Sequence, residues 1–384
     1  MKLILNGDYN KKLIDEISKK GLPVTHYIMY VPQNSIGSSS IFLPRSLPNW
    51  DEFNDFVQHV KQTEITPIAQ IDSTCQGNFE AHVEQFHATI SLMERLKHLG
   101  IKEVVVSSPN NVGFIKAKFP TFKIYLSYSQ LVVSMNRAKI FFEVGADNII
   151  LHPDVARNMN TLKNFLKLPS KLGRSQESEF ILPLNLGCNW GCIQWYYHHN
   201  LQSHRTISSP VFENQSEISN VKDEFDYPLL YCWKKRVEDP KRILKACWIS
   251  PLDLVYYEEM GYENFLLFTN GMNTPQSISL IESYTKKTLD LDFNEFLQIP
   301  HPYGDYWPKD LANNSLIQLT PEIISEFSGK LPRNGTHTEE DLNRYYEEFS
   351  DKTPAGDLKA RETLLSLIEK KLEELRKGAI GGNK

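Results

Sequence analysis

Eight short apolar runs alternate with stretches of helical periodicity across residues 1–288, and this alternation constrains the fold more than any other feature. Short strands that are apolar at nearly every position are typical of a parallel sheet covered on both faces. Eight such strands predict a closed (β/α)8 barrel of the TIM type. An open doubly wound sheet has less support, because no dinucleotide-binding glycine motif follows any strand. The predicted strands are Met1–Leu5, His26–Val31, Pro67–Ile71, Glu103–Val106, Lys123–Leu126, Asn148–Leu151, Phe180–Leu186 and Asn264–Phe268.

The helices between these strands are predicted from apolar residues that recur on one face. Several of the helices end at a glycine, which suits the return from a helix to the next strand. Cys247–Ile249 could add a short extra strand before the last strand–helix pair. The predicted helices are Asn10–Lys20, Pro48–Thr63, Asn78–Leu99, Ser129–Val144, Leu162–Leu168, Pro251–Met260 and Pro275–Thr285.

Residues 289–384 are predicted to form a C-terminal extension to the barrel. The part from Leu289 to Thr353 is rich in proline, asparagine, tyrosine and acidic residues, and it is expected to be irregular. Asp357–Lys377 is predicted to be an amphipathic helix, with Leu364, Ile368 and Leu372 on one stripe. This helix could pack on the barrel, which is the simpler interpretation, or pair with another chain.

Composition excludes several classes of protein. The net charge of −5 gives no general nucleic-acid signal, and no segment is apolar for long enough to suggest a membrane span. The N-terminus becomes polar too soon for a signal peptide, so a cytoplasmic protein is expected. Five cysteines in 384 residues are too few for a disulfide framework, and a reducing compartment favours ligand or redox roles for those that cluster.

The stretch from Leu182 to His204 contains the strongest candidate site. Cys188 and Cys192 lie in a loop rich in glycine, asparagine and tryptophan, beyond the carboxyl end of the seventh strand. Such a loop suits ligation better than packing. Cys232 and Cys247 could join the pair, because barrel loops converge on this face. Four thiolates suit a zinc ion or a [4Fe–4S] cluster, and the spacing favours the cluster slightly.

Polar and aromatic residues follow the two cysteines closely. His198, His199 and His204 could each be a ligand, a proton donor or a phosphate contact, or could be structural. The aromatic residues could line a site for a flat substrate or shield a cluster from water; they are Trp190, Trp195, Tyr196 and Tyr197. A basic run, Lys234–Arg236, is expected to be a solvated face. Neither a GxSxG elbow nor an HExxH zinc motif occurs, so hydrolysis has little support.

Three passages resemble the collagenase-like peptidase family U-32, and in particular its branch of iron–sulfur barrels related to oxygen-independent hydroxylation proteins. The first passage is Lys123–Val155, with its GADNIIL strand. The second is LNLGCNWGCIQWYYHHNLQSH, which is similar to the branch's Cys-x3-Cys…His…Asn…Ser-His segment. The third is Tyr231–Phe268, with a single cysteine, a DP turn and YYEEMG.

The resemblance implies a (β/α)8 barrel that holds an oxygen-sensitive [4Fe–4S] cluster. Cys188, Cys192 and Cys232 match the branch's cysteines, whereas the branch pattern does not require Cys247. With three thiolates the fourth iron would be open to substrate, and with Cys247 the cluster would be closed and suited to electron transfer. Four polar positions also match the branch: His199, Asn200, Ser203 and His204. Of these, we predict His199, Asn200 and His204 to be catalytic.

The chain departs from the branch at a few positions. Ile193 stands where the branch has proline, Trp195 or Tyr196 where it has arginine, and Thr269–Gly271 where a terminal arginine is expected. These departures leave the substrate unknown. The implied function is an oxidoreductase-type iron–sulfur enzyme that performs oxygen-independent hydroxylation or a related redox modification, with an electron donor or partner subunit. The alternatives are a peptidase or other hydrolase, and a non-catalytic cluster or zinc-binding interaction protein.

Overall fold

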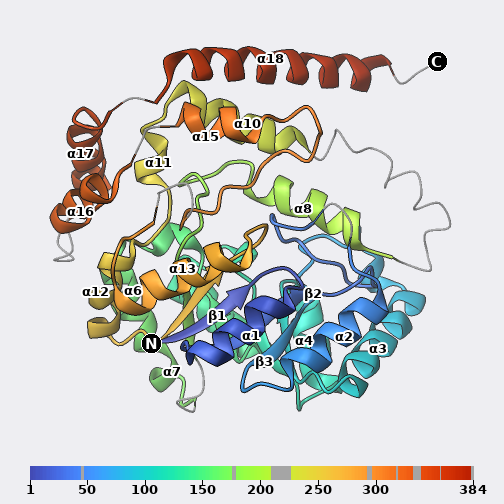
Figure 1. Cartoon of the computed structure of the whole chain (residues 1–384). Helices are drawn as coiled ribbons and strands as arrows, with labels where there is room; N and C mark the ends of the chain where they lie inside the picture. The colour runs from blue at the N-terminus through green and yellow to red at the C-terminus, as the bar shows by residue number, and fades with distance from the viewer. Residues whose placement is uncertain are drawn as a thin grey trace.

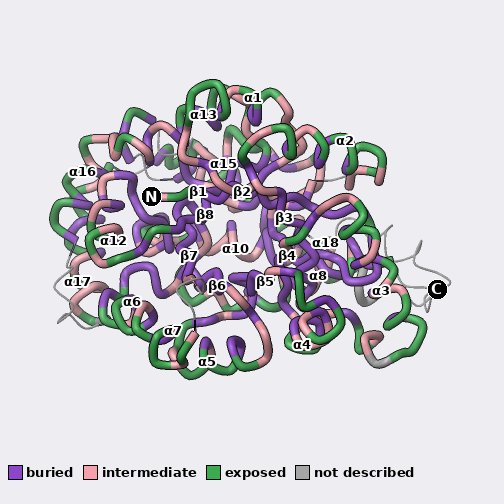
Figure 2. The backbone as a smooth tube through the Cα atoms, turned by 90° about the horizontal axis from the view of Figure 1, so that it is seen from below, coloured by how far each residue is buried: buried purple, intermediate pink, exposed green. Residues whose placement is uncertain are grey.

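Eight parallel strands close into a barrel in chain order, so the (β/α)8 prediction is confirmed. The computed structural model describes residues 1–44, 47–174, 179–208, 226–291, 296–316, 319–331, 339–354 and 356–381. β1 pairs with both β2 and β8, which closes the barrel (Figures 1 and 2). The strands are β1 (Lys2–Asn6), β2 (Val24–Tyr30), β3 (Thr66–Gln70), β4 (Glu103–Val106), β5 (Lys123–Leu126), β6 (Asn148–Ile150), β7 (Phe180–Pro183) and β8 (Asn264–Phe268).

Helices form a ring around the strands, as Figure 2 shows along the barrel. Their ends follow from local chemistry. In α1 the Asn10 side chain accepts the N–H of Leu13, and the helix ends at Gly21 in the left-handed conformation. A capping box of Asn49 and Glu52 begins α2. The ring contains α1 (Lys11–Lys20), α2 (Trp50–Val60), α3 (Val83–His98), α4 (Pro109–Lys118), α5 (Met135–Val144), α6 (Met159–Leu166), α7 (Leu168–Lys171), α12 (Leu254–Met260) and α13 (Thr274–Lys286).

Apolar side chains fill two layers. Alternate strand positions point into the barrel, where they form a compact cluster, and the other positions pack against the ring of helices. The strand residues of the inner cluster are Ile4, Ile28, Ile68, Val105, Tyr125, Ile150, Ile181, Leu266 and Phe268. The interior of the barrel is therefore a packed core.

Three local predictions need correction. The helix predicted over Ser129–Val144 begins only at Met135, where Ser134 caps it, and a 3₁₀ turn (Tyr128–Gln130) precedes it. α4 is not predicted from the sequence, because its apolar residues form no clear stripe. Cys247–Ile249 is not a strand: the Ile249 N–H donates a single hydrogen bond to the Leu184 carbonyl, at 2.7 Å.

The connection from β7 to β8 is the longest of the barrel and carries four of the five cysteines. It contains α8 (Trp195–Thr206), α10 (Tyr227–Glu238) and α11 (Arg242–Lys245) before α12. Beyond α13, the segment expected to be irregular contains α15 (Lys309–Ser315), α16 (Pro321–Lys330) and α17 (Glu339–Ser350). None of the described helices is both long enough and apolar enough to cross a membrane.

The predicted amphipathic helix corresponds to α18 (Leu358–Gly381), which lies across α10 and α15 (Figure 1). Leu364, Ile368 and Leu372 are buried against the same chain. Packing within the chain therefore accounts for the apolar stripe.

Just after β7 ends, the side chain of Asn185 forms the hydrogen bonds to neighbouring backbone groups that a longer strand would form. Its side-chain N–H₂ donates to the Phe268 and Phe296 carbonyls, at 2.8 and 3.0 Å, and its Oδ1 accepts the Phe268 N–H at 2.9 Å. We expect Asn185→Ala to lower the free energy of unfolding by about 2 kcal/mol, because buried backbone groups lose their partners. Urea unfolding followed by circular dichroism measures this. Asn54→Ala, on the exposed face of α2, is the matched control, and equal losses in the two variants would contradict the assignment.

Candidate functional site

A tight passage of the chain places Cys188. Leu186 pairs with Gln298, and the Gly187 N–H donates to the Gln298 carbonyl at 2.8 Å. A Cβ at Gly187 would lie only 2.7 Å from Ile299 Cγ1 and 3.0 Å from the Gln298 carbonyl oxygen. Glycine is thus required directly before the first cysteine, and the loop that follows is held in one position.

Cys188, Cys192 and Cys232 converge, although Cys232 lies on a separate helix, α10. Burial raises the pKa of Cys188 well above its usual value, and the nearby Cys232 and Cys192 raise it further. Burial and then Cys232 raise the pKa of Cys192 to about 11. Asn189 Nδ2 lies 3.4 Å from Cys232 Sγ, so the loop and α10 also meet through a hydrogen bond. The three thiols form one site, called here the thiol site.

Arg236 lies one helical turn after Cys232 and is buried, with an exposed fraction of 1%. Its guanidinium donates to the Gly187 carbonyl and lowers the thiol pKa values of Cys188 and Cys192. The expectation that Lys234–Arg236 is a solvated face is therefore wrong for Arg236, whereas Lys234 and Lys235 pair with surface carboxylates. A buried cation beside Cys188 and Cys192 favours negative charge on them, against the effect of burial.

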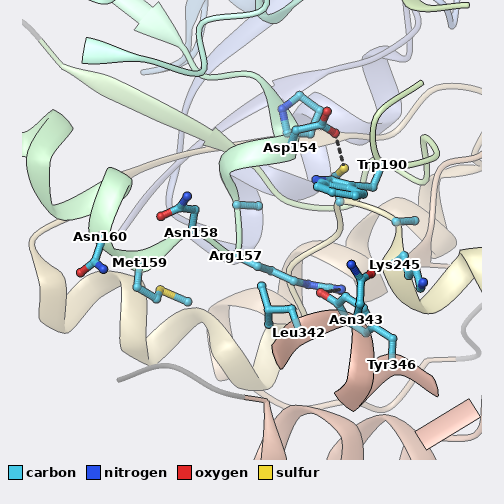
Figure 3. A pocket seen from close by; sticks show the side chains of 14 residues that line it. Asp154, Arg157, Asn158, Met159, Asn160, Trp190, Lys245, Leu342, Asn343 and Tyr346 are labelled. Atoms are coloured by element: carbon cyan, nitrogen blue, oxygen red, sulfur yellow. Dashed lines mark hydrogen bonds between the residues drawn. The ribbon is translucent and has the colours of Figure 1, made fainter. Parts of the chain in front are cut away.

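Cys247 joins the site through Asp154. Cys247 is buried, and its thiol donates to Asp154 Oδ1 at 2.9 Å, the dashed line in Figure 3. The Gly191 N–H donates to the other carboxylate oxygen at 3.2 Å. Burial raises the pKa values of both Asp154 and Cys247. Asp154 is missing from the sequence prediction. Its position just after β6 could have indicated a site residue, because the carboxyl ends of barrel strands carry the functional face.

A cavity of about 140 Å³ opens beside this Asp154–Cys247 pair (Figure 3). It lies between the loop after β6, the loop that carries Cys188 and Cys192, α11 and α17. Polar and aromatic side chains surround it, including Asp154, Arg157, Trp190, Lys245, Cys247 and Tyr346. A small molecule, or the end of a larger one, could reach Cys247 and Asp154 from here.

The aromatic residues of the stretch divide into two groups. Trp195 is buried in the inner cluster against which Cys188 and Cys192 pack, and its Nε1 donates to the Ser129 carbonyl at 3.0 Å. Trp190, Tyr196 and Tyr197 are exposed. Trp195 thus shields the thiol site from the barrel side, and only Trp190 reaches the cavity.

The predicted catalytic residues on α8 point to two different places. His199 is buried under the barrel mouth, where its Nδ1 donates to the Ser39 carbonyl at 2.6 Å, which leaves Nε2 as the acceptor. Asn200 Oδ1 accepts from Thr74 Oγ1 at 2.7 Å. His204 Nε2 lies 3.3 Å from Cys75 Sγ. Asn200 and His204 therefore contact the loop after β3, and within the described part of the chain their hydrogen bonds do not reach the thiol site.

No three His, Cys, Asp or Glu side chains within the described ranges are placed so that they could hold a single metal ion. Cys232 and Cys192 nevertheless lie close enough to Cys188 to raise its pKa. A single zinc needs every ligand atom at about 2.0–2.3 Å from one point, whereas an iron–sulfur cluster distributes its thiolates over several iron atoms. The three thiols are donors of the kind that hold a cluster, whereas no described set of three ligands surrounds one point as a zinc ion requires.

Buried histidines near the barrel mouth should make the fold sensitive to acid. Burial lowers the pKa of His152 to about 3 and that of His199 to about 4. In the unfolded chain a histidine has a pKa of about 6.5, so the unfolded state binds more protons below that pH. Stability is then complete above about pH 6.5 and is lost as the pH falls toward the folded-state pKa values.

We expect each of these two histidines to reduce the free energy of unfolding by about 2 kcal/mol between pH 7 and pH 5. Urea unfolding at both pH values measures the loss. It should be smaller by about that amount in His199→Gln and unchanged in His87→Gln, a variant of an exposed histidine on α3. The same pH dependence in both variants would contradict the assignment.

The fold is similar to that of the U32 peptidase Mk0906, with a TM-score of 0.51 and 17% identity, over 71% of this chain and 93% of that one. The expected resemblance to family U-32 is thus confirmed at the level of the fold, and this chain is a (β/α)8 barrel of U32-peptidase-like fold. No protein-family model and no curated protein matches the chain.

Two other solved structures are more distant. An HpcH/HpaI aldolase from Desulfitobacterium hafniense has a TM-score of 0.28 and 12% identity, over 75% of this chain and 93% of its own. An endo-beta-1,4-mannanase from Thermotoga petrophila has a TM-score of 0.34 and 8% identity, over 71% and 67%. Scores this low carry no argument about function.

Proposed function

We propose that this chain is an iron–sulfur barrel enzyme that catalyses oxygen-independent hydroxylation, or a related redox modification, of a substrate that enters the cavity beside Cys247. The observation that carries the proposal is the convergence of Cys188, Cys192 and Cys232 from two separate segments. The sequence resemblance to iron–sulfur barrels of family U-32 supports the same conclusion.

The protonation of the thiols sets what a bound metal centre would have to do. Burial and mutual proximity raise the pKa values of Cys188 and Cys192, so both are protonated at neutral pH when nothing is bound. A metal centre would displace those protons and supply the positive charge that three neighbouring thiolates need. Arg236 provides part of that charge within the protein.

A bound [4Fe–4S] cluster would supply one-electron redox chemistry. Cys188, Cys192 and Cys232 would hold it, and Trp195 would exclude water from the barrel side. Cys247 either completes the ligand set or remains a thiol that donates to Asp154. With a raised pKa and one face on the cavity, Asp154 can hold or release a proton next to the substrate.

Anaerobic purification followed by iron, sulfide and zinc analysis tests the proposal. We expect a brown protein with about four iron atoms and as many sulfides per chain. A colourless protein with one zinc and no sulfide would overturn the proposal and favour the zinc-binding interaction protein. Reduction of the loaded protein by dithionite should bleach its visible absorption, which separates a redox-active cluster from adventitious iron.

A further inference from the structure

The loop after β3 is attached to one face of α8 near Cys75. The Thr74 N–H donates to Ser203 Oγ at 3.0 Å, and Thr74 Oγ1 donates to Asn200 Oδ1 at 2.7 Å. Asn200, Ser203 and His204 share a helix face, because they are three and four positions apart. These bonds fix the neighbouring Cys75, whose Sγ lies 3.3 Å from His204 Nε2.

We propose that Cys75 and His204 form a nucleophilic thiol–imidazole pair that accepts an acyl group from an ester or a thioester. Both side chains are accessible: His204 is exposed and Cys75 is half-buried. A nucleophile and a base within hydrogen-bond reach at a barrel's carboxyl-end face are the minimum that acyl transfer requires. Burial lowers the pKa of His204, so its imidazole is neutral at pH 7 and can accept the thiol proton.

Backbone donors lie next to the thiol. Within the residues that the structure describes, the N–H groups of Cys75, Gln76 and Gly77 donate to no protein acceptor. Gly77 and Asn78 have positive φ, so the backbone turns directly after Gln76. Unpaired N–H groups beside a nucleophile can stabilise the negative charge that develops on a carbonyl oxygen during attack.

The reaction balances without a redox partner. As the Cys75 sulfur forms a bond to the acyl carbon, the thiol proton moves to His204 Nε2 and the carbon–oxygen bond of the ester breaks. The imidazolium then protonates the departing alkoxide. In the second half, neutral His204 takes a proton from water while the water oxygen bonds to the acyl carbon and the carbon–sulfur bond breaks. The imidazolium returns this proton to the Cys75 sulfur, so that an acid and an alcohol are the net products.

This pair is separate from the thiol site. Cys75 is not among the groups that raise the pKa values of Cys188, Cys192 or Cys247. The Asn200 side chain accepts a hydrogen bond from Thr74 and not from His204. Cys75 and His204 are therefore a two-residue pair and not part of a Cys–His–Asn triad. The inference goes beyond the proposed iron–sulfur function and does not depend on it.

The test is acetylation of the full chain by p-nitrophenyl acetate at pH 7, with peptide mapping by mass spectrometry. We expect Cys75 to gain an acetyl group at least about 10-fold faster than any other cysteine, and His204→Gln to slow this by about 100-fold. His87→Gln should react like the parent protein, and Cys75→Ser should release no burst of nitrophenolate.

The acetylation rates of the five cysteines can be compared within the parent protein. The test therefore gives a result even if His204→Gln does not fold. Equal acetylation rates in His204→Gln and His87→Gln would overturn the proposal. So would a Cys75 that reacts no faster than the other cysteines, or one that iodoacetamide alkylates but the ester does not acetylate. Iron-free protein should give the same result, so failure here would not affect the iron–sulfur proposal.

Discussion

Replacing Cys192 by serine is expected to leave less than about one iron atom per chain after anaerobic purification, against about four in the parent protein. Cys192 belongs to the thiol site, since Cys232 raises its pKa and Cys192 in turn raises that of Cys188. Loss of one of the three converging thiolates should therefore remove the cluster and not merely loosen it. Iron and sulfide analysis, with the visible spectrum, measures the result.

Two further serine variants sharpen this experiment. Cys75→Ser is the matched control and should retain the parent's iron content, because Cys75 lies at a different loop. Cys247→Ser distinguishes an open from a closed cluster: retained iron means that three thiolates suffice, and lost iron makes Cys247 the fourth ligand. If Cys192→Ser keeps the full iron content, the thiol site does not hold the cluster.

Arg157→Met is expected to lower the free energy of unfolding by about 3 kcal/mol. Arg157 is a buried cation that donates to the Leu244 and Trp248 carbonyls, and to the Tyr346 hydroxyl at 2.9 Å. Its guanidinium also lies 4.8 Å from the Trp248 ring centroid. Methionine fills similar space but leaves these acceptors without a donor. Urea unfolding followed by circular dichroism gives the free energy.

Arg344→Met is the control for this variant. Arg344 lies on α17, like Tyr346, but it is exposed and forms an ion pair with Asp341 on the same helix. We expect its replacement to change the free energy of unfolding by no more than about 0.5 kcal/mol. A loss for Arg157→Met within that same range would show that the buried guanidinium does not attach α17 to the barrel.

Most of the barrel could be predicted because parallel strands buried on both faces are short apolar runs that stand out in a sequence. Helices were predicted where caps and stripes coincide, as at Asn10 and Gly21 of α1. α4 lacks such a stripe, so only its packing stabilises it as a helix. The helices between Leu289 and Thr353 are short and depend on contacts such as those of Arg157, which no local pattern indicates.

The candidate site was predicted only in part, for a similar reason. Cys188 and Cys192 stand out because glycine and tryptophan surround them. Asp154 and Arg236 were missed because their roles come from burial, and burial of a charged residue has no local sequence signal. Cys75 and His204 are 129 residues apart, so only the folded chain shows that they meet.

The position of α18 on α10 connects the C-terminus with the thiol site. Arg361 donates to the Val237 carbonyl at 3.1 Å, and Glu369 pairs with Lys234, two positions after Cys232. Docking of α18 and ligand binding at Cys232 thus both require α10 to be in its place. By thermodynamic linkage each favours the other, so a metal centre at the thiols would also protect the last helix from proteolysis.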